Sequence, residues 1–181
     1  MELLKLLELR QSVRAYQSRP VEAEKLEKLI EAVRLAPSAS NSQPWKLIIV
    51  DDTELKNKVS QATFSTLVSF NRFAPQAPVL AVLVIEKTSM VTQIGAMLKS
   101  REFSLIDIGI AAEHFCLQAA ELGLGSCMLG WFDEAAIKRL LHIPDSRRIG
   151  LVITLGYAEE QAPIRPKIRK SVDEMSSYNR Y

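Results

Sequence analysis

The stretch of residues 104–122 constrains the fold more than any other part of this chain of 181 residues. Its length predicts a helix of about five turns, with Ser104 as its N-terminal cap and Gly123 as a left-handed stop after its end. A helix this apolar must be buried on several sides, inside a core or across a subunit interface. Its apolar residues fall around most of the circumference: Leu105, Ile106, Ile108, Ile110, Ala111, Ala112, Phe115, Cys116, Leu117, Ala119 and Ala120.

Four apolar stretches predict the strands of a sheet, and they are residues 45–50, 78–86, 125–131 and 149–156. The second stretch is apolar throughout, as expected of a central strand that is covered on both faces. Strands and helices alternate loosely along the chain, with long helices between some of the strands. The pattern therefore predicts a three-layer sandwich of the α+β or α/β class.

Three more helices are predicted around this sheet. Residues 21–36 form the first, because their apolar side chains recur at spacings of three and four. Asp52 or Thr53 caps a second helix over residues 54–61, and Asp133 caps a third. The stripe of the first helix consists of Leu26, Leu29, Ile30 and Val33.

The length predicts one domain over residues 1–181. Residues 157–181 are polar and contain two prolines, and we expect them to form a C-terminal extension that wraps a surface or a partner. Residues 62–76 give mixed signals. Residues 90–101 are either a helix or a mobile excursion from the fold.

Composition and charge exclude several classes of protein. The net charge of +2, from 23 basic and 21 acidic residues, creates no long-range positive field, so nucleic acid is not an expected partner. No apolar run reaches the roughly 18 residues of a membrane span, and the first ten residues lack the apolar core of a signal peptide. The two cysteines, Cys116 and Cys127, are then expected to be reduced thiols in a cytoplasmic protein.

The common catalytic motifs are absent. Gly123, Gly125 and Gly130 have the wrong spacing for a dinucleotide fingerprint, and they lie between a helix and a strand rather than after a strand. The two histidines, His114 and His142, have no metal-ligand spacing with the cysteines. No serine nucleophile motif is present. A chain that lacks its own acid, base and nucleophile often borrows its chemistry from a cofactor.

Three segments carry binding chemistry. Residues 10–14 place two guanidinium groups and a hydroxyl within five positions, which suits a phosphate. Residues 36–45 form a loop of small hydroxyl and amide side chains that could bind a flat polar ligand. Residues 165–170 are a second basic cluster, far from the first in sequence. Each segment read alone is also compatible with an ordinary solvated turn, connection or tail.

Four motifs occur in a fixed order: Arg-Gln-Ser-Val-Arg at 10–14, Ala-Pro-Ser-Ala-Ser-Asn-Ser-Gln-Pro-Trp at 36–45, Asp-Ile-Gly-Ile-Ala-Ala at 107–112 followed by Ala-Glu-Leu-Gly-Leu-Gly-Ser at 120–126, and Lys-Ile-Arg at 167–169. Together they resemble the FMN-dependent nitroreductase family, and this chain resembles a short, single-domain member. The resemblance spans nearly the whole chain. It implies an α+β fold, a three-layer α/β/α sandwich whose central, mainly antiparallel sheet is flanked by helices in an intertwined homodimer.

The resemblance implies a cofactor site that joins both ends of the chain. Arg10 and Ser12 would bind the FMN phosphate together with Lys167 and Arg169. Arg14 would lie near the pyrimidine side of the flavin, where a cation stabilises the negative charge of the reduced ring. Backbone N–H groups near flavin N5 would come from Met128, Leu129 and Gly130.

The resemblance also implies that each site needs two chains. The residues that would approach the flavin of the other subunit are Ser38, Ala39, Ser40 and Asn41. Gln11 departs from the pattern, because the family often has a basic residue there. A flavin contact of Asn71 and a redox role of Cys127 stay open, and residues 87–103 carry no motif that defines a substrate.

The resulting expectation is an FMN-dependent oxidoreductase with no metal ion and no catalytic side chain. It would pass hydride from NADH or NADPH through flavin N5 to an oxidised small molecule, such as a nitroaromatic or a quinone, in a ping-pong cycle. Another flavin-dependent reaction (a dehydrogenase, a dehalogenase or a flavin-fragmenting enzyme) and a non-catalytic flavin-binding dimer are the alternatives. The physiological acceptor and the choice between NADH and NADPH do not follow from the sequence.

Overall fold

A computed structural model describes residues 2–87, 102–160 and 163–181 of the chain. Its centre is a four-stranded sheet in the order β1-β2-β4-β3, in which every neighbouring pair is antiparallel. The strands are β1 (Trp45–Val50), β2 (Val79–Ile85), β3 (Gly125–Leu129) and β4 (Arg148–Gly156). The predicted central position of β2 is confirmed, because its first six residues are all buried.

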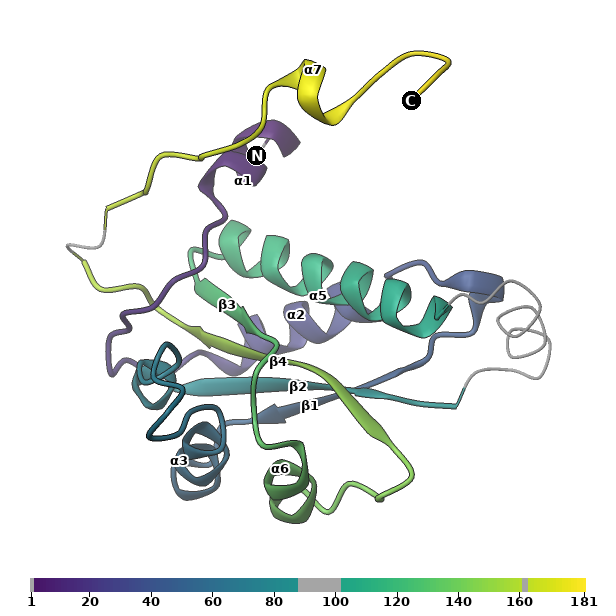
Figure 1. Ribbon diagram of the computed structural model, residues 1–181. Helices are drawn as coiled ribbons and strands as arrows, with labels where there is room; N and C mark the ends of the chain where they lie inside the picture. The colour runs from purple at the N-terminus through teal and green to yellow at the C-terminus, as the bar shows by residue number, and fades with distance from the viewer. Residues whose placement is uncertain (1, 88–101, 161–162) are drawn as a thin grey trace.

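Helices cover both faces of this sheet (Figure 1). Helices α2 (Ala23–Arg34) and α5 (Phe103–Glu121) pack on one face, and α3 (Thr53–Gln61) and α6 (Glu134–Leu140) pack on the other. The predicted three-layer α+β sandwich with an antiparallel sheet is therefore confirmed. The short elements outside these layers are α1 (Leu3–Leu9), α7 (Val172–Met175) and the 3-10 turns η1 (Ala39–Asn41) and η2 (Ala74–Gln76).

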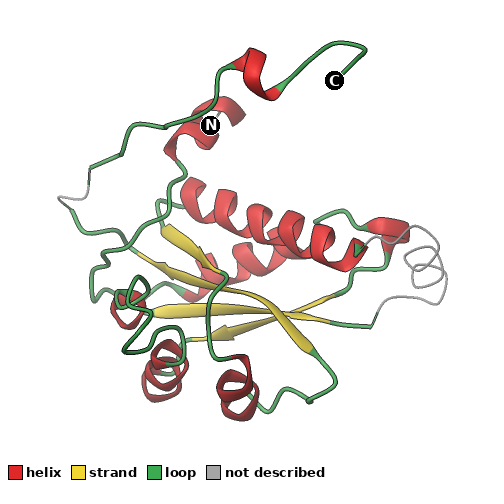
Figure 2. Cartoon of the chain, in the orientation of Figure 1, coloured by secondary structure: helices red, strands yellow, loops and turns green. Residues whose placement is uncertain are grey.

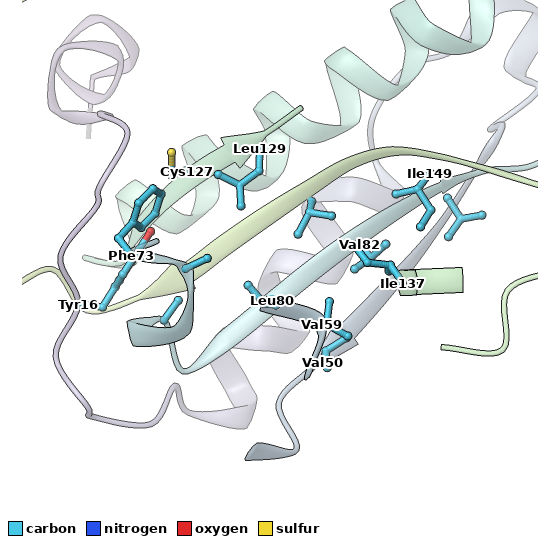
Figure 3. Close-up of a cluster of buried hydrophobic side chains, with 14 of the residues drawn as sticks. Tyr16, Val50, Val59, Phe73, Leu80, Val82, Cys127, Leu129, Ile137 and Ile149 are labelled. Atoms are coloured by element: carbon cyan, nitrogen blue, oxygen red, sulfur yellow. The ribbon is translucent and has the colours of Figure 1, made fainter. Parts of the chain in front are cut away.

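Each face of the sheet has its own hydrophobic core. The core under α2 and α5 includes Leu29, Phe115 and Ile153, which are fully buried. The core over α3 and α6 is shown in Figure 3, where Tyr16 and Phe73 lie at one end and Ile137 lies at the other. Because apolar side chains of β2 alternate between the two cores, this strand needs an apolar residue at nearly every position.

The predicted helix ends agree with the structure in most places. Asp52 caps α3 by accepting a hydrogen bond from the N–H of Leu55 at 2.8 Å, and Asp133 caps α6 through the N–H of Ala136 at 2.9 Å. Gly123 has a φ of +74°, as expected of a glycine that ends a helix.

The prediction that Ser104 caps the long helix is wrong. Helix α5 begins at Phe103, so Ser104 lies inside its first turn, and Glu102 occupies the cap position without a side-chain hydrogen bond. Helix α5 is also less enclosed in the single chain than its composition suggests, since Leu105 and Ile106 are about half exposed. The predicted element at residues 90–101 lies outside the described residues.

Residues 10–17, called here the N-terminal segment, run along the edge of the sheet beside β3. Ser12 forms a parallel bridge with Ser126, and Tyr16 forms an antiparallel bridge with Ala158. The Tyr16 hydroxyl lies 2.7 Å from Oγ1 of Thr154. These contacts hold the N-terminal segment against both β3 and the end of β4.

Residues 163–181, called here the C-terminal arm, are exposed except for the partly buried Lys167. Figure 2 shows the arm rising past α1 and ending away from the sheet. A predicted role of residues 157–181 in wrapping a partner stays a prediction. Across the described parts of the chain, no helix is long and apolar enough to cross a membrane.

Candidate functional site

Glycine at position 125 allows the N-terminal segment to reach the sheet. The N–H of Val13 donates to the carbonyl of Ser126 at 2.9 Å, which brings the Val13 side chain onto Gly125. A Cβ atom added at Gly125 would lie 2.6 Å from Cγ2 of Val13, closer than any normal contact. The close approach therefore depends on glycine and fixes Ser12 beside Ser126, near the start of the edge strand β3.

The C-terminal arm meets the N-terminal segment and closes a cleft of about 540 Å³. Arg165 donates to the carbonyl of Ser12, and Nζ of Lys167 donates to the carbonyl of Arg10. The structure thus brings together the two basic clusters that are more than 150 residues apart in sequence. The cleft is lined by Arg10, Gln11, Ser12, Arg14, Arg165, Pro166, Lys167, Ile168 and Arg169.

Positive charge in this cleft is largely unbalanced. Within the described parts of the chain, its lining includes five cationic side chains and no carboxylate. The one ion pair found there for these cations joins Nε of Arg10 to Oε1 of Glu113 at 3.6 Å. That nitrogen is buried and has no hydrogen-bond partner within the described residues. Burial and the neighbouring guanidinium groups of Arg10 and Arg169 lower the pKa of Lys167. Such a cluster is suited to a multiply charged anion, since an anion would relieve the repulsion among its cations.

The end of β3 leads away from this cleft along the same edge. Gly130 follows Ser126 by four residues, which is roughly 13 Å along an extended strand. Leu129 is only 3% exposed, so its side chain is packed in the core rather than open to a ligand on the surface. Gly130 is exposed, and a Cβ atom there would meet no other atom within 4 Å. Met128 lies between Ser126 and Leu129 along β3 and is partly buried.

Cys127 points to the same region as Ser12 and Arg14. It is 5% exposed, and burial raises the pKa of its thiol despite the nearby guanidinium of Arg14. A raised pKa disfavours the thiolate, which is the form of cysteine that reacts. Cys127 therefore has the environment of a packed side chain.

The turn at residues 38–41 lies elsewhere in the single chain. The N–H of Ala39 donates to Oδ1 of Asp107 at 3.1 Å, which places this turn beside the start of α5. Figure 1 shows β3 near the other end of that helix. Ser40 and Asn41 are exposed and have left-handed φ values of 51° and 52°. The structure thus separates Ser38, Ala39, Ser40 and Asn41 from the cleft of their own chain.

Asn71 is buried and its amide protons are already used. Its Nδ2 donates to the carbonyl of Thr63 at 3.0 Å and to the carbonyl of Trp131 at 3.2 Å. These bonds tie residues 63–71 to the turn after β3. Phe70 packs edge-to-face on Trp131, with 6.3 Å between the ring centroids. Through its bond to Trp131, Asn71 therefore helps to fix the backbone next to Gly130.

Sequence reasoning missed the part that Gln11 plays in the site. Its Oε1 accepts from the N–H of Arg165 at 3.1 Å, and its Nε2 donates to the carbonyl of Pro163 at 3.3 Å. The family resemblance marks Gln11 only as a departure from a position that is often basic. No signal in the sequence marks a surface glutamine as a link between residues that are so distant in the chain.

A second cavity, of about 640 Å³, lies between the N-terminal segment, α3 and η2. Its one cationic lining residue, Lys56, donates from Nζ to the carbonyl of Pro75 at 2.8 Å, and Asp51 also lines the cavity. It lacks the excess positive charge of the cleft at Arg10. Among the described residues, no group of three or more histidine, cysteine, aspartate or glutamate side chains could hold a metal ion.

Comparison with known proteins places this chain among flavin enzymes. The model described as "Nitroreductase family" matches residues 7–157. A protein of Archaeoglobus fulgidus, named as a candidate NADH dehydrogenase/NAD(P)H nitroreductase, is 33% identical over 88% of this chain and 87% of its own length. The structure of an FMN-dependent nitroreductase from Clostridium difficile R20291 has a TM-score of 0.78 at 28% identity, and covers 98% of this chain and 99% of its own. An iodotyrosine deiodinase of Thermotoga neapolitana is 26% identical over 91% of this chain and 93% of its own length.

Proposed function

This chain belongs to the nitroreductase family, and we propose on that premise that it is an FMN-dependent oxidoreductase that takes its electrons from NADH or NADPH. The observation that carries the proposal is the cleft between the two ends of the chain, whose described lining contains five cations and no carboxylate. A phosphate is the group that this cleft fits best, and FMN is the phosphorylated flavin.

The phosphate would be held by side chains from both sides of the cleft. Arg10 offers a buried Nε that has no hydrogen-bond partner among the described residues. Ser12 adds a hydroxyl, and Lys167 and Arg169 add two cations from the C-terminal arm. Charge-assisted bonds of this kind are about twice as strong as neutral ones. The donor set therefore matches the charge and the geometry of a phosphate.

The edge of β3 would hold the ring system. The path from the Ser12 bridge to Gly130 follows the edge strand β3, whose residues are buried or partly buried. Gly130 is exposed just after this strand and has room for a ligand against its backbone. Arg14 is exposed next to this edge and would stabilise negative charge on the pyrimidine side. Bound FMN would supply the hydride-transfer chemistry between the nicotinamide and an oxidised substrate.

The chain would work as a homodimer with its cofactor sites at the subunit interface. The turn at residues 38–41 is remote from the cleft of its own chain, and it presents polar groups and left-handed backbone to the outside. Apolar side chains that are at least half exposed, such as Leu3, Leu4 and Ile106, gather on helices α1 and α5. A partner chain that covers them would bring its own turn to this cleft.

The chain's own residues would bind and orient substrates rather than exchange protons with them. The lining of the cleft contains no histidine and no carboxylate, so water is the expected source of protons. The nicotinamide and the oxidised acceptor, a nitroaromatic or a quinone, would use the same exposed face in turn. This sharing predicts ping-pong kinetics.

An absorbance spectrum of the purified protein, before and after NADH or NADPH is added without oxygen, tests this function. We expect a yellow protein that is bleached by at least one nicotinamide and recovers its colour when a quinone is added. A protein that stays colourless and gains no flavin absorbance with added FMN would contradict the proposal at its first step.

The similarity to an iodotyrosine deiodinase favours one second candidate, reductive dehalogenation. It would use the same cofactor site but a different acceptor and a different electron donor. Bound FMN that neither nicotinamide bleaches, but that is reduced chemically and then oxidised by a halogenated phenol, would favour the dehalogenase over the NAD(P)H oxidoreductase.

A further inference from the structure

The C-terminal arm is attached to the rest of the described chain at one place. Every described hydrogen bond between residues 163–181 and the remainder of the protein ends on residues 10–12. Gln11 supplies both ends of its amide to this contact, through the carbonyl of Pro163 and the N–H of Arg165. The hold of the arm on the body therefore depends on three consecutive residues.

The charges on the two sides oppose this attachment. The arm brings Arg165, Lys167 and Arg169 to a cleft that already contains Arg10 and Arg14. Like charges at close range repel, and partial burial makes the repulsion stronger than it is in water. No arm residue has a recorded ion pair with a carboxylate of the body among the described residues. An anion in the cleft would turn this repulsion into attraction.

A neutral amide is well suited to position 11 for this reason. Its oxygen accepts from the N–H of Arg165 and lies 3.4 Å from Nε of the same residue, while its nitrogen donates to Pro163. A lysine or arginine would offer no acceptor for that N–H and would add a further positive charge. Gln11 thus bonds to the arm on both sides of Ile164 without adding to the repulsion.

We propose that Gln11 is a positioning residue that holds the C-terminal arm in place for the cofactor phosphate, and that phosphate binding and arm docking are coupled. The coupling rests on the proposed FMN function, whereas the contact of Gln11 with the arm does not. Since coupling is reciprocal, FMN tightens the arm on the body, and a docked arm tightens FMN.

Limited digestion of the full-length protein with trypsin measures arm docking directly. Lys167, Arg169 and Lys170 are trypsin sites in the arm, and the mass of the remaining chain reports their cleavage. In the flavin-free protein we expect rapid loss of the arm. Saturating FMN slows this cleavage at least tenfold, whereas riboflavin, which lacks the phosphate, leaves it unchanged. Equal protection by riboflavin would overturn the coupling through phosphate.

Two substitutions separate the parts of the proposal. Gln11→Ala removes both bonds to the arm, so we expect faster cleavage of the flavin-free protein and an FMN dissociation constant that is roughly tenfold higher, the effect of losing about one net hydrogen bond. Gln11→Glu keeps the acceptor and pairs with Arg165 but places a negative charge beside the phosphate. It should slow cleavage relative to Gln11→Ala and still weaken FMN binding.

Gln61→Ala is the matched control, because Gln61 is exposed at the end of α3 and remote from the arm. It should behave as the unchanged protein in both assays. If Gln11→Ala also matched the unchanged protein in cleavage rate and in FMN affinity, the positioning role would be wrong. If the unchanged protein bound no FMN, the proposed function would fail, and cleavage of the flavin-free Gln11→Ala variant would still decide the contact with the arm.

Discussion

Asp107 in the core helix α5 accepts a hydrogen bond from the backbone N–H of Ala39, with 3.1 Å between Oδ1 and the nitrogen. Asp107 is only 3% exposed, and its Oδ2 has no hydrogen-bond partner among the described residues. The turn that it holds includes Ser40 and Asn41 in left-handed backbone conformations. A buried carboxylate thus fixes the turn that we propose to serve the partner's cofactor.

Replacing Asp107 tests this attachment. Asp107→Ala leaves the turn without its anchor, and we expect about 1–3 kcal/mol lower stability in urea unfolding, together with weaker FMN binding. Asp107→Asn retains an acceptor oxygen and should lose less of both. Glu121→Gln, on the exposed end of the same helix, is the control. An asparagine variant as damaged as the alanine variant would show that the charge matters, rather than the bond to Ala39.

The phosphate assignment predicts selective losses of FMN affinity. Arg10→Ala and Lys167→Ala should each weaken FMN binding by about 1.5–3 kcal/mol, the scale of a charge-assisted hydrogen bond. Neither change should affect the affinity for riboflavin. Titration of intrinsic flavin fluorescence measures both constants. Lys58→Ala, which removes an exposed cation paired with Glu54 at 2.5 Å, should leave them unaltered.

Arg14 should act on the electronics of the flavin more than on its affinity. We expect the reduction potential of bound FMN to fall further in Arg14→Ala than in Arg10→Ala, because a cation near the ring stabilises the reduced form more than a cation at the phosphate does. Anaerobic titration against a reference dye gives both potentials. Equal shifts would place Arg14 at the phosphate instead of the ring.

Gly125, the first residue of β3, and Gly130, just after its last residue, should respond differently to the same change. Gly125→Ala forces Val13 away from the edge strand, and we expect about 1–3 kcal/mol lower stability and weaker FMN binding. Gly130→Ala meets no neighbouring atom in the chain, so its stability should stay within about 0.5 kcal/mol. Its rate of reduction by NADH or NADPH should still fall. A normal rate would remove Gly130 from the flavin site.

A surface network around Glu22 predicts a pH dependence of stability. The Tyr157 hydroxyl donates to Glu22 at 2.6 Å and Arg19 pairs with it at 2.6 Å, and these bonds lower its pKa to about 2 from an ordinary value of 4.5. A pKa that is lower in the folded state gives stability that is present above pH 4.5 and is lost as the pH falls toward 2.

Thermal unfolding of the unchanged protein and of Glu22→Gln from pH 2 to pH 7 tests this dependence. The two melting temperatures should differ most above pH 4.5 and converge toward pH 2. Glu24→Gln is the control, because Glu24 is exposed in the first turn of α2, the helix that Glu22 precedes; it should show no such pattern. A constant difference across the whole range would assign the effect to packing.

The elements of the fold followed from local patterns in the sequence. The unbroken apolar run of β2 required two covering layers, and the caps Asp52 and Asp133 marked helix starts that the structure reproduces. The predicted start of α5 was wrong, because no capping side chain marks it: Glu102 occupies the cap position without a side-chain hydrogen bond. Patterns of this kind are readable because they depend on residues within one or two turns of each other.

The residues of the site could be named from the sequence, but their meeting is a property of the tertiary structure. The sequence of residues 10–14 suggested a phosphate site, and that of residues 36–45 suggested a loop for a flat polar ligand. Only the folded chain places Lys167 against Arg10 and leaves residues 38–41 at a distance from both. The role of Gln11 arose entirely from its partners Pro163 and Arg165. Local sequence determines which segments become helices or strands, because the periodicity of their apolar side chains and their capping residues are local. Contacts between the two ends of the chain depend on how the sheet edge and the arm come together in space. Only the tertiary structure decides that arrangement.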